Sequence, residues 1–189
     1  METDRGKEEN FFKEILKASF IALIIVIPIR FYVAQPFIVS GASMSPAFES
    51  GHYLVVDQLS YRFEEPERGD IIIFKYPRDT SKFFIKRIIG LPGETLTLKA
   101  GALTIANSTH PGGFVFEEPY VAEANQVSGS FSVELGDNEY FVMGDNRGQS
   151  SDSRVWGPLQ KDLIVGQAFL RIFPIRQLDV LPGGYKSTL

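Results

Sequence analysis

The sequence predicts a mainly β protein in which an N-terminal transmembrane helix precedes an antiparallel, barrel-like β-domain with a smaller inserted β-domain. Two observations lead to this prediction. The only long apolar run of the chain lies before residue 40. After residue 40, short runs rich in Ile, Val, Phe and Tyr alternate with Gly and Pro, and no helical period is sustained. This spacing is typical of a β-barrel or β-sandwich.

The N-terminal run is interpreted as a retained membrane anchor over residues 11–33. Its centre, residues 18–29, contains no charge, and residues 11–29 nearly reach the roughly 20 residues that a spanning helix needs if charged side chains near its start lie at the interface. A cleavable signal peptide is the alternative, but no A-x-A cleavage site follows the run.

The flanking cations predict how this anchor is oriented. Several Lys and Arg residues precede the apolar run, whereas Arg30 is the only one between the run and Arg62. Cytoplasmic segments carry the excess of Lys and Arg. We therefore expect a single-pass protein of the cell membrane, in contact with membrane lipid, with residues 1–10 in the cytoplasm and the β-domain on the extracytoplasmic face.

The β-domain is expected to comprise residues 34–95 and 139–189. Residues 96–138 are richer in Gly, Ser, Thr and Asn, which indicates an inserted β-subdomain of unassigned role. The β-like runs, in order, are HYLVVDQL, GDIIIFKYP, KFFIKRIIG, ETLTLKAGALTIA, GSFSVEL, NEYFVMG and DLIVGQAFLRIFPI.

Composition limits the classes of function. Of the 189 residues 44% are apolar, so the chain can form a sizeable core. The net charge of -4 predicts no nucleic-acid partner. The absence of Cys excludes thiol catalysis and disulfides. With only His52 and His110, neither a metal site nor a Ser-His-Asp triad is expected.

The segment Ser40–Pro46, SGASMSP, has two interpretations. It is either a polar linker between the anchor and the β-domain, or the carrier of a nucleophilic hydroxyl. A linker needs nothing else from the chain. A nucleophile needs a base, an oxyanion donor and a substrate groove, so the remaining segments decide between the two.

A candidate base lies in the run SKFFIKRIIG. Side chains alternate across a strand, so Lys86 shares a face with Phe84 and Ile88. Burial among apolar groups lowers the pKa of a lysine, and a neutral lysine can act as a general base. The alternative is a lysine at the sheet edge whose ammonium group reaches solvent.

The loop Met143–Pro158, MGDNRGQSSDSRVWGP, is polar and contains few apolar residues. Such loops are often simply solvated. However, Asp152 and Arg154, two residues apart, suit a buried, hydrogen-bonded loop. A loop of this kind could position the base through a serine hydroxyl.

Four segments together resemble the bacterial type I signal peptidases. These segments are SGASMSP, RGDIIIFKYP, FIKRIIGLPGE and GDNRGQSSDSRVWGP, which follow the apolar run in the order that the family has them. The resemblance implies a membrane-anchored serine endopeptidase that removes N-terminal signal peptides from exported preproteins. It also implies a Ser-Lys dyad that needs no metal or cofactor.

Carried over to this chain, the resemblance implies that Ser43 is the nucleophile and Lys86 the general base. It implies that Ser150 orients the lysine amine and that the Ser43 backbone N–H holds the oxyanion. Gly41 stands where some members have a serine whose hydroxyl assists, so no side-chain donor is expected there. The implied supporting residues are Asp145, Asn146, Arg147, Asp152 and Arg154.

The resemblance implies a substrate with small side chains at the first and third positions before the scissile bond. Physically, an extended peptide is expected to add along a strand edge. Bulky residues next to the dyad would leave room only for Ala-sized side chains. For each of them, plain core packing is the alternative. The candidate pocket residues are Ile38, Met44, Phe48, Phe84 and Ile85.

Three other functions are considered. A self-cleaving Ser-Lys repressor of the LexA type would be soluble and would carry DNA-binding segments, so the anchor and the G-D-N-R loop argue against it. A conjugation-type processing peptidase stays open. An anchored β-domain that binds exported peptides without cutting them would have no need for Ser43, Lys86 and Ser150 together.

Overall fold

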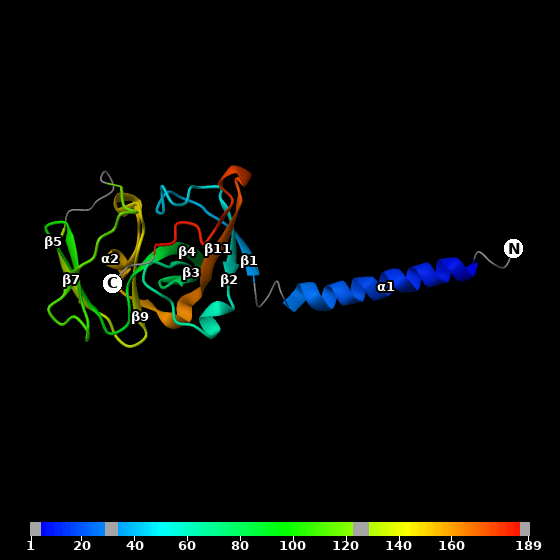
Figure 1. Cartoon of the computed structure of the whole chain (residues 1–189), viewed down its shortest axis with the longest axis horizontal. Helices are drawn as coiled ribbons and strands as arrows, with labels where there is room; N and C mark the ends of the chain where they lie inside the picture. Colours follow the sequence, from blue (N-terminus) through cyan, green and yellow to red (C-terminus); the bar gives the residue numbers. More distant parts are fainter. Residues whose placement is uncertain (1–4, 29–33, 123–128, 186–189) are drawn as a thin grey trace.

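The computed structural model describes residues 5–28, 34–122 and 129–185. In these residues a long helix precedes a β-domain of short strands (Figure 1). The elements are α1 (Arg5–Pro28), β1 (Ala34–Ile38), β2 (Tyr53–Asp57), η2 (Ser60–Arg62), β3 (Ile71–Tyr76), β4 (Asp79–Gly90), β5 (Thr95–Lys99), β6 (Ala102–Ala106), β7 (Phe114–Val115), β8 (Phe131–Glu134), β9 (Glu139–Met143), η4 (Arg147–Gln149), α2 (Ser153–Trp156), β10 (Leu159–Gln160), η5 (Lys161–Leu163), β11 (Ile164–Phe173), η6 (Ile175–Gln177) and β12 (Asp179–Val180).

The helix α1 extends away from the β-domain (Figure 1). It exposes large apolar side chains, among them Leu16, Phe20 and Leu23. Of the helices in the described ranges, none combines the length and the apolar content that crossing a membrane requires. Residues 1–4 of the predicted cytoplasmic segment and residues 29–33 of the predicted anchor lie outside the described ranges.

The β-domain is built on an antiparallel sheet with the strand order β1-β2-β11-β3-β4-β9-β10, and β12 pairs with β11. The predicted mainly β, antiparallel class is confirmed. Within the described ranges the strands do not close into a barrel. Among the described residues β1 pairs only with β2, and β4 pairs with β9 only from Arg87 onward. The first part of β4 therefore keeps one unpaired edge, and a cavity separates it from β1.

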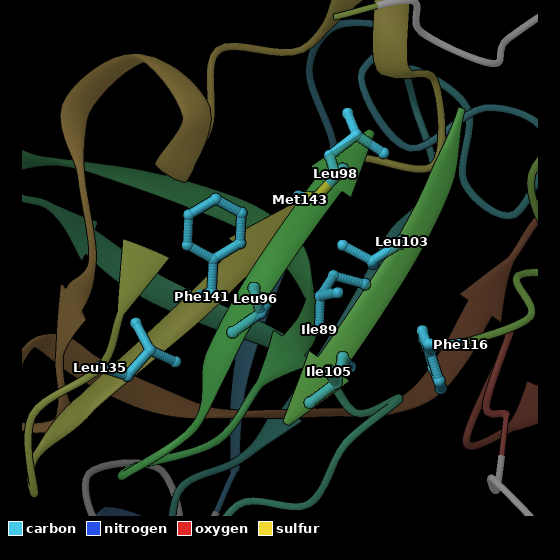
Figure 2. Close-up of a cluster of buried hydrophobic side chains, with 9 residues drawn as sticks. All are labelled: Ile89, Leu96, Leu98, Leu103, Ile105, Phe116, Leu135, Phe141 and Met143. Atoms are coloured by element: carbon cyan, nitrogen blue, oxygen red, sulfur yellow. The ribbon is translucent and has the colours of Figure 1, made fainter. Parts of the chain in front are cut away.

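A second antiparallel sheet, with the order β7-β6-β5-β8, lies within residues 95–134. Its strands alternate buried and exposed side chains, so one apolar face packs against the end of the main sheet. Figure 2 shows this shared core, in which Leu96 and Ile105 meet Ile89 of β4 and Phe141 of β9. Leu96 lies directly against Gly90, where a Cβ atom would overlap the leucine methyl groups.

A separate apolar cluster packs beneath the segment that follows β1. The segment contributes Met44 and Phe48, which are fully buried against strands β2, β3 and β11. This packing fixes the Ser40–Pro46 segment to the sheet, so the segment is not a loose linker. The members of the cluster are Val39, Met44, Phe48, Leu54, Val56, Ile71, Ile73 and Ala168.

We expect Leu96→Ala to lower the free energy of unfolding by about 3 kcal/mol, because it removes a fully buried side chain and leaves a cavity between the two sheets. Denaturant unfolding of the full chain in mild detergent measures the change. The matched control is Leu178→Ala, since Leu178 is 62% exposed. Equal losses in the two variants would contradict a shared core.

Candidate active site

Ser43 and Lys86 lie side by side although 43 positions separate them in the chain. The distance between Lys86 Nζ and Ser43 Oγ is 2.8 Å. Ser43 lies in the turn that follows β1, and Lys86 lies in β4 opposite Ile72 of β3. Lys86 Nζ also donates to the backbone oxygen of Ile85, at 2.9 Å. A neutral amine held this way can accept the proton of the serine hydroxyl.

Burial lowers the pKa of Lys86 to about 8. The negative charges of Asp152 and Asp145 act in the opposite direction and raise it. The side chain has little contact with solvent, and the Phe84 ring centroid lies 5.4 Å from Nζ. Because burial disfavours the ammonium form, a large part of the Lys86 population is neutral near pH 8.

The turn that carries Ser43 is fixed by backbone hydrogen bonds. Ser45 N donates to Ala42 O at 3.2 Å, and Asn146 N donates to Ser43 O at 3.0 Å. The Ser43 N–H has no acceptor among the described residues, so it is available to a developing oxyanion. Gly41 has a φ of +94°, a backbone conformation that glycine adopts far more readily than serine.

The loop after β9 is held by one buried carboxylate. Asp152 accepts two hydrogen bonds from the Arg154 side chain, at 2.7 and 2.8 Å, and one from Gly144 N at 3.1 Å. It also caps the N-terminus of α2. Burial raises the pKa of Asp152, but the hydrogen bonds from Arg154 and the nearby Ser150 hydroxyl outweigh it and lower the pKa overall. The carboxylate therefore stays ionised beside Lys86.

Ser150 and Ser43 approach the same point of the backbone, Gly144. A Cβ atom at Gly144 would overlap both Ser43 O and Ser150 Oγ. Ser150 Oγ is buried and makes no hydrogen bond of normal geometry within the described chain, although its proximity helps to lower the pKa of Asp152. The structure thus places the predicted base-orienting hydroxyl in the site without joining it to Lys86.

A second buried ion pair lies behind the dyad. Arg87 Nε and Nη2 donate to the two carboxylate oxygens of Asp145 at 2.8 and 2.6 Å, and both side chains are fully buried. Arg87 Nη1 donates to the backbone oxygens of Gly69 and Gly183. The sequence analysis did not assign Arg87 a role. The sequence offers only one indication of its role. Arg87 follows Lys86 in a strand, so its side chain is expected on the opposite face of the sheet.

The other predicted supporting residues act in different ways. Asn146 contributes its backbone N–H, which binds Ser43 O. Arg147 faces the second sheet rather than the dyad, since its guanidinium pairs with both carboxylate oxygens of Glu118. The sequence analysis missed Glu118, because no motif surrounds it.

A cavity of about 490 Å³ opens beside the dyad. It lies between the end of β1 with the Ser43 turn on one side and residues 82–86 of β4 on the other. Three of the five predicted pocket residues line it, namely Ile38, Phe84 and Ile85. Met44 and Phe48 do not, because the turn directs them into the core beneath. The remaining lining residues are Ser43 and Lys86 themselves with Phe37, Val39, Ser40, Gly41, Ala42, Leu54, Ile73, Lys82, Phe83, Gln149 and Ser151.

Comparison with known proteins relates most of the chain to one family. The model of a family described as signal peptidase, peptidase S26, matches residues 12–173. The chain is 39% identical over 172 residues to a probable signal peptidase I-1 of Synechocystis sp., which covers 87% of this chain and 84% of the relative. It is 33% identical over 183 residues to a signal peptidase I of Leptolyngbya laminosa, with 93% and 86% covered.

Two further comparisons come from other bacteria. The chain is 36% identical over 156 residues to signal peptidase I V of Bacillus subtilis, which covers 79% of this chain and 92% of the relative. A crystal structure of a signal peptidase I from Enterococcus faecalis V583 aligns with a TM-score of 0.47 and 33% sequence identity, over 55% of this chain and 97% of that one.

We expect Gly144→Ala to slow the reaction of Ser43 with a serine-directed organophosphonate about 100-fold, because the new methyl group displaces Ser43 O and moves the hydroxyl away from Lys86. The rate of covalent labelling, followed by mass spectrometry, measures the effect. Gly148→Ala in the same loop is the control, since a Cβ atom there meets nothing within 4 Å. Equal labelling rates in both variants would contradict the close approach.

Proposed function

The chain belongs to the type I signal peptidases of peptidase family S26, which are serine endopeptidases, and we propose that it removes signal peptides from exported preproteins with a Ser43–Lys86 dyad. The 2.8 Å distance between Lys86 Nζ and Ser43 Oγ is the observation that carries the dyad. It supports a nucleophile and a base in direct contact, with the lysine buried enough to be neutral.

In the first step Ser43 Oγ attacks the carbonyl carbon of the scissile bond while its proton passes to neutral Lys86 Nζ. The negative charge that develops on the carbonyl oxygen is held by the Ser43 N–H, whose availability supports this role. Loss of such a donor costs about 10²–10³ in rate in comparable enzymes. Gly41 has no side chain that could assist it.

Lys86 then gives its proton to the leaving amine, and the C–N bond breaks. The protein is left with an ester between Ser43 and the new C-terminus of the signal peptide. Neutral Lys86 next takes a proton from a water molecule, whose oxygen attacks the ester carbonyl. The bond from that carbon to Ser43 Oγ then breaks, Lys86 returns the proton to Ser43 Oγ, and the peptide acid is released. We assign Ser150 to orient the amine during these transfers, and its buried hydroxyl without a well-formed hydrogen bond supports this.

The substrate lies between two unpaired strand edges. The outer edge of β1 and the first part of β4 flank the cavity beside the dyad. An extended peptide there can hydrogen-bond to both strands and place alternate side chains towards the cavity floor. Ile38, Phe84 and Ile85 restrict that floor and favour small residues at the first and third positions before the bond.

We further propose that residues 11–33 attach the protein to the cell membrane, with the N-terminus in the cytoplasm and the β-domain on the extracytoplasmic face. The apolar run, the cations that precede it and the exposed apolar side chains of α1 support this. In this arrangement residues 34–95 and 139–189 form the catalytic unit, and residues 96–138 form an inserted subdomain.

Cleavage of a preprotein by the detergent-solubilised full chain tests the proposed function. We expect cleavage after the signal peptide by the unaltered protein. Ser43→Ala should lose it almost completely because no nucleophile remains. Lys86→Met should also lose cleavage almost completely, because no base remains. Gel analysis with N-terminal sequencing of the product measures this. An inert unaltered protein, or a variant that still cuts at an appreciable rate, refutes the assignment.

The pH profile of cleavage should report Lys86. Only the neutral amine accepts the serine proton, so kcat/KM should be constant well above pH 8 and fall tenfold per pH unit well below the lysine pKa of about 8. Initial rates of preprotein cleavage between pH 6 and 10 measure this fall in kcat/KM on the acid side. A rate that stays constant down to pH 6 would contradict Lys86 as the base.

A further inference from the structure

One short segment of the inserted subdomain touches two of the buried arginines around Ser43 and Lys86, namely Arg87 and Arg147. It comprises residues 118–120, just after β7, and is called the clip here. Glu118 accepts two hydrogen bonds from the Arg147 guanidinium, and the Nη1–Oε2 distance is 2.7 Å. The Tyr120 ring lies against the guanidinium of Arg87, with 4.0 Å between Cζ and the ring centroid. The Tyr120 hydroxyl donates to Glu118 at 2.9 Å.

The clip is not a solvated surface contact. The side chains of Glu118 and Arg147 are only 14% and 7% exposed, so their ion pair is weakly screened. A bidentate arginine–carboxylate pair also fixes the relative orientation of its two partners. Removing one partner would leave the other charge buried and unpaired. The geometry therefore restrains the position of Arg147 more firmly than an exposed pair would.

Arg147 in turn holds the backbone of the 144–154 loop, which lies beside Ser43 and Lys86. Arg147 Nε donates to Gly144 O at 3.0 Å, and the backbone oxygen of Arg147 accepts from Arg154 Nη2 at 2.7 Å. Gly144 contacts Ser43 and binds Asp152 through its N–H. A guanidinium held by the clip thus stabilises the backbone on both sides of Asn146, whose N–H binds Ser43 O.

We propose that the clip is a positioning element for signal peptide cleavage, through which the inserted subdomain holds the 144–154 loop against Ser43 and Lys86. The inference rests on the proposed function and gives residues 96–138 a role in it. Glu118, Tyr120 and Arg147 are positioning residues, because none of them lines the cavity beside the dyad. The clip therefore acts on the rate of the chemical steps rather than on substrate affinity.

The first test is Glu118→Gln in the full chain, assayed for preprotein cleavage in detergent. We expect kcat to fall at least about tenfold, because a displacement of the loop misaligns Ser43 and Lys86. KM should change less than kcat, because the clip itself lies outside the cavity and the loop contributes only Gln149 and Ser151 to its lining. Glu117→Gln is the matched control, because the neighbouring Glu117 is exposed and outside these contacts. Unchanged kcat in Glu118→Gln refutes the proposal.

Glu118→Asp separates positioning from a general loss of stability. The shorter carboxylate keeps the charge, so it should recover part of the kcat that Glu118→Gln loses. Thermal unfolding of each variant shows whether it is folded at the assay temperature. If Glu118→Gln does not fold, Tyr120→Phe replaces it, because it removes only the hydroxyl that donates to Glu118. The proposal is refuted if Glu118→Asp is folded but recovers none of the lost kcat. Where Tyr120→Phe has to replace Glu118→Gln, an unchanged kcat in Tyr120→Phe refutes it.

Backbone amide exchange supplies a measurement that does not depend on activity. In Glu118→Gln the amides of residues 144–150 should exchange at least about tenfold faster than in the unaltered chain, because the loop loses its restraint. Glu117→Gln should leave them unchanged. If the unaltered chain cleaves no preprotein but amide exchange rises in Glu118→Gln, the proposed function is wrong, whereas the restraint of the loop by the clip is supported. If cleavage is normal and exchange does not change, the clip proposal fails alone.

Discussion

The site depends on keeping the amine of Lys86 buried away from water although two carboxylates lie near it. Burial lowers the pKa of Lys86, and the charges of Asp145 and Asp152 oppose that change. Each carboxylate is bound on both oxygens by an arginine, Arg87 or Arg154. These arginines offset the negative field that would otherwise keep the amine protonated. The buried ion pairs thus bear on the protonation of Lys86 as well as on the framework of the site.

The two unpaired edges of the sheet also shape the surroundings of Ser43 and Lys86. A barrel closed between β1 and β4 would hydrogen-bond the two edges that flank the cavity. Leaving them apart makes room for an extended chain beside Ser43. The floor of the groove is rigid because the cluster under the Ser43 turn anchors both Met44 and Phe48. In the proposed function, a rigid floor and two free edges would let main-chain hydrogen bonds supply affinity while a few side chains set specificity.

Strand periodicity and motif order predict much of this site, but not the contacts between distant segments. Alternation places Lys86 among apolar residues, and resemblance pairs it with Ser43. Met44 and Phe48 were predicted to line the pocket because they neighbour Ser43 in sequence, whereas the turn directs them inward. Glu118 lies in a segment without a motif. Its partnership with Arg147 depends on how two sheets pack, which a one-dimensional pattern does not encode.

The unpaired edge of β1 also bears on whether two copies of the chain could pair through this part of the sheet. A free strand edge next to an apolar groove is a template for pairing with a second copy of the same chain. β1 contains Pro36, which lacks a backbone N–H and so weakens any continuous ladder. Across the groove, Lys82 keeps most of its side chain in solvent and forms an ion pair with Asp79 at 2.9 Å, and burying such an exposed charged pair against another strand is unfavourable. Both features disfavour edge-to-edge pairing of two copies and are compatible with the single peptide strand of the proposed function.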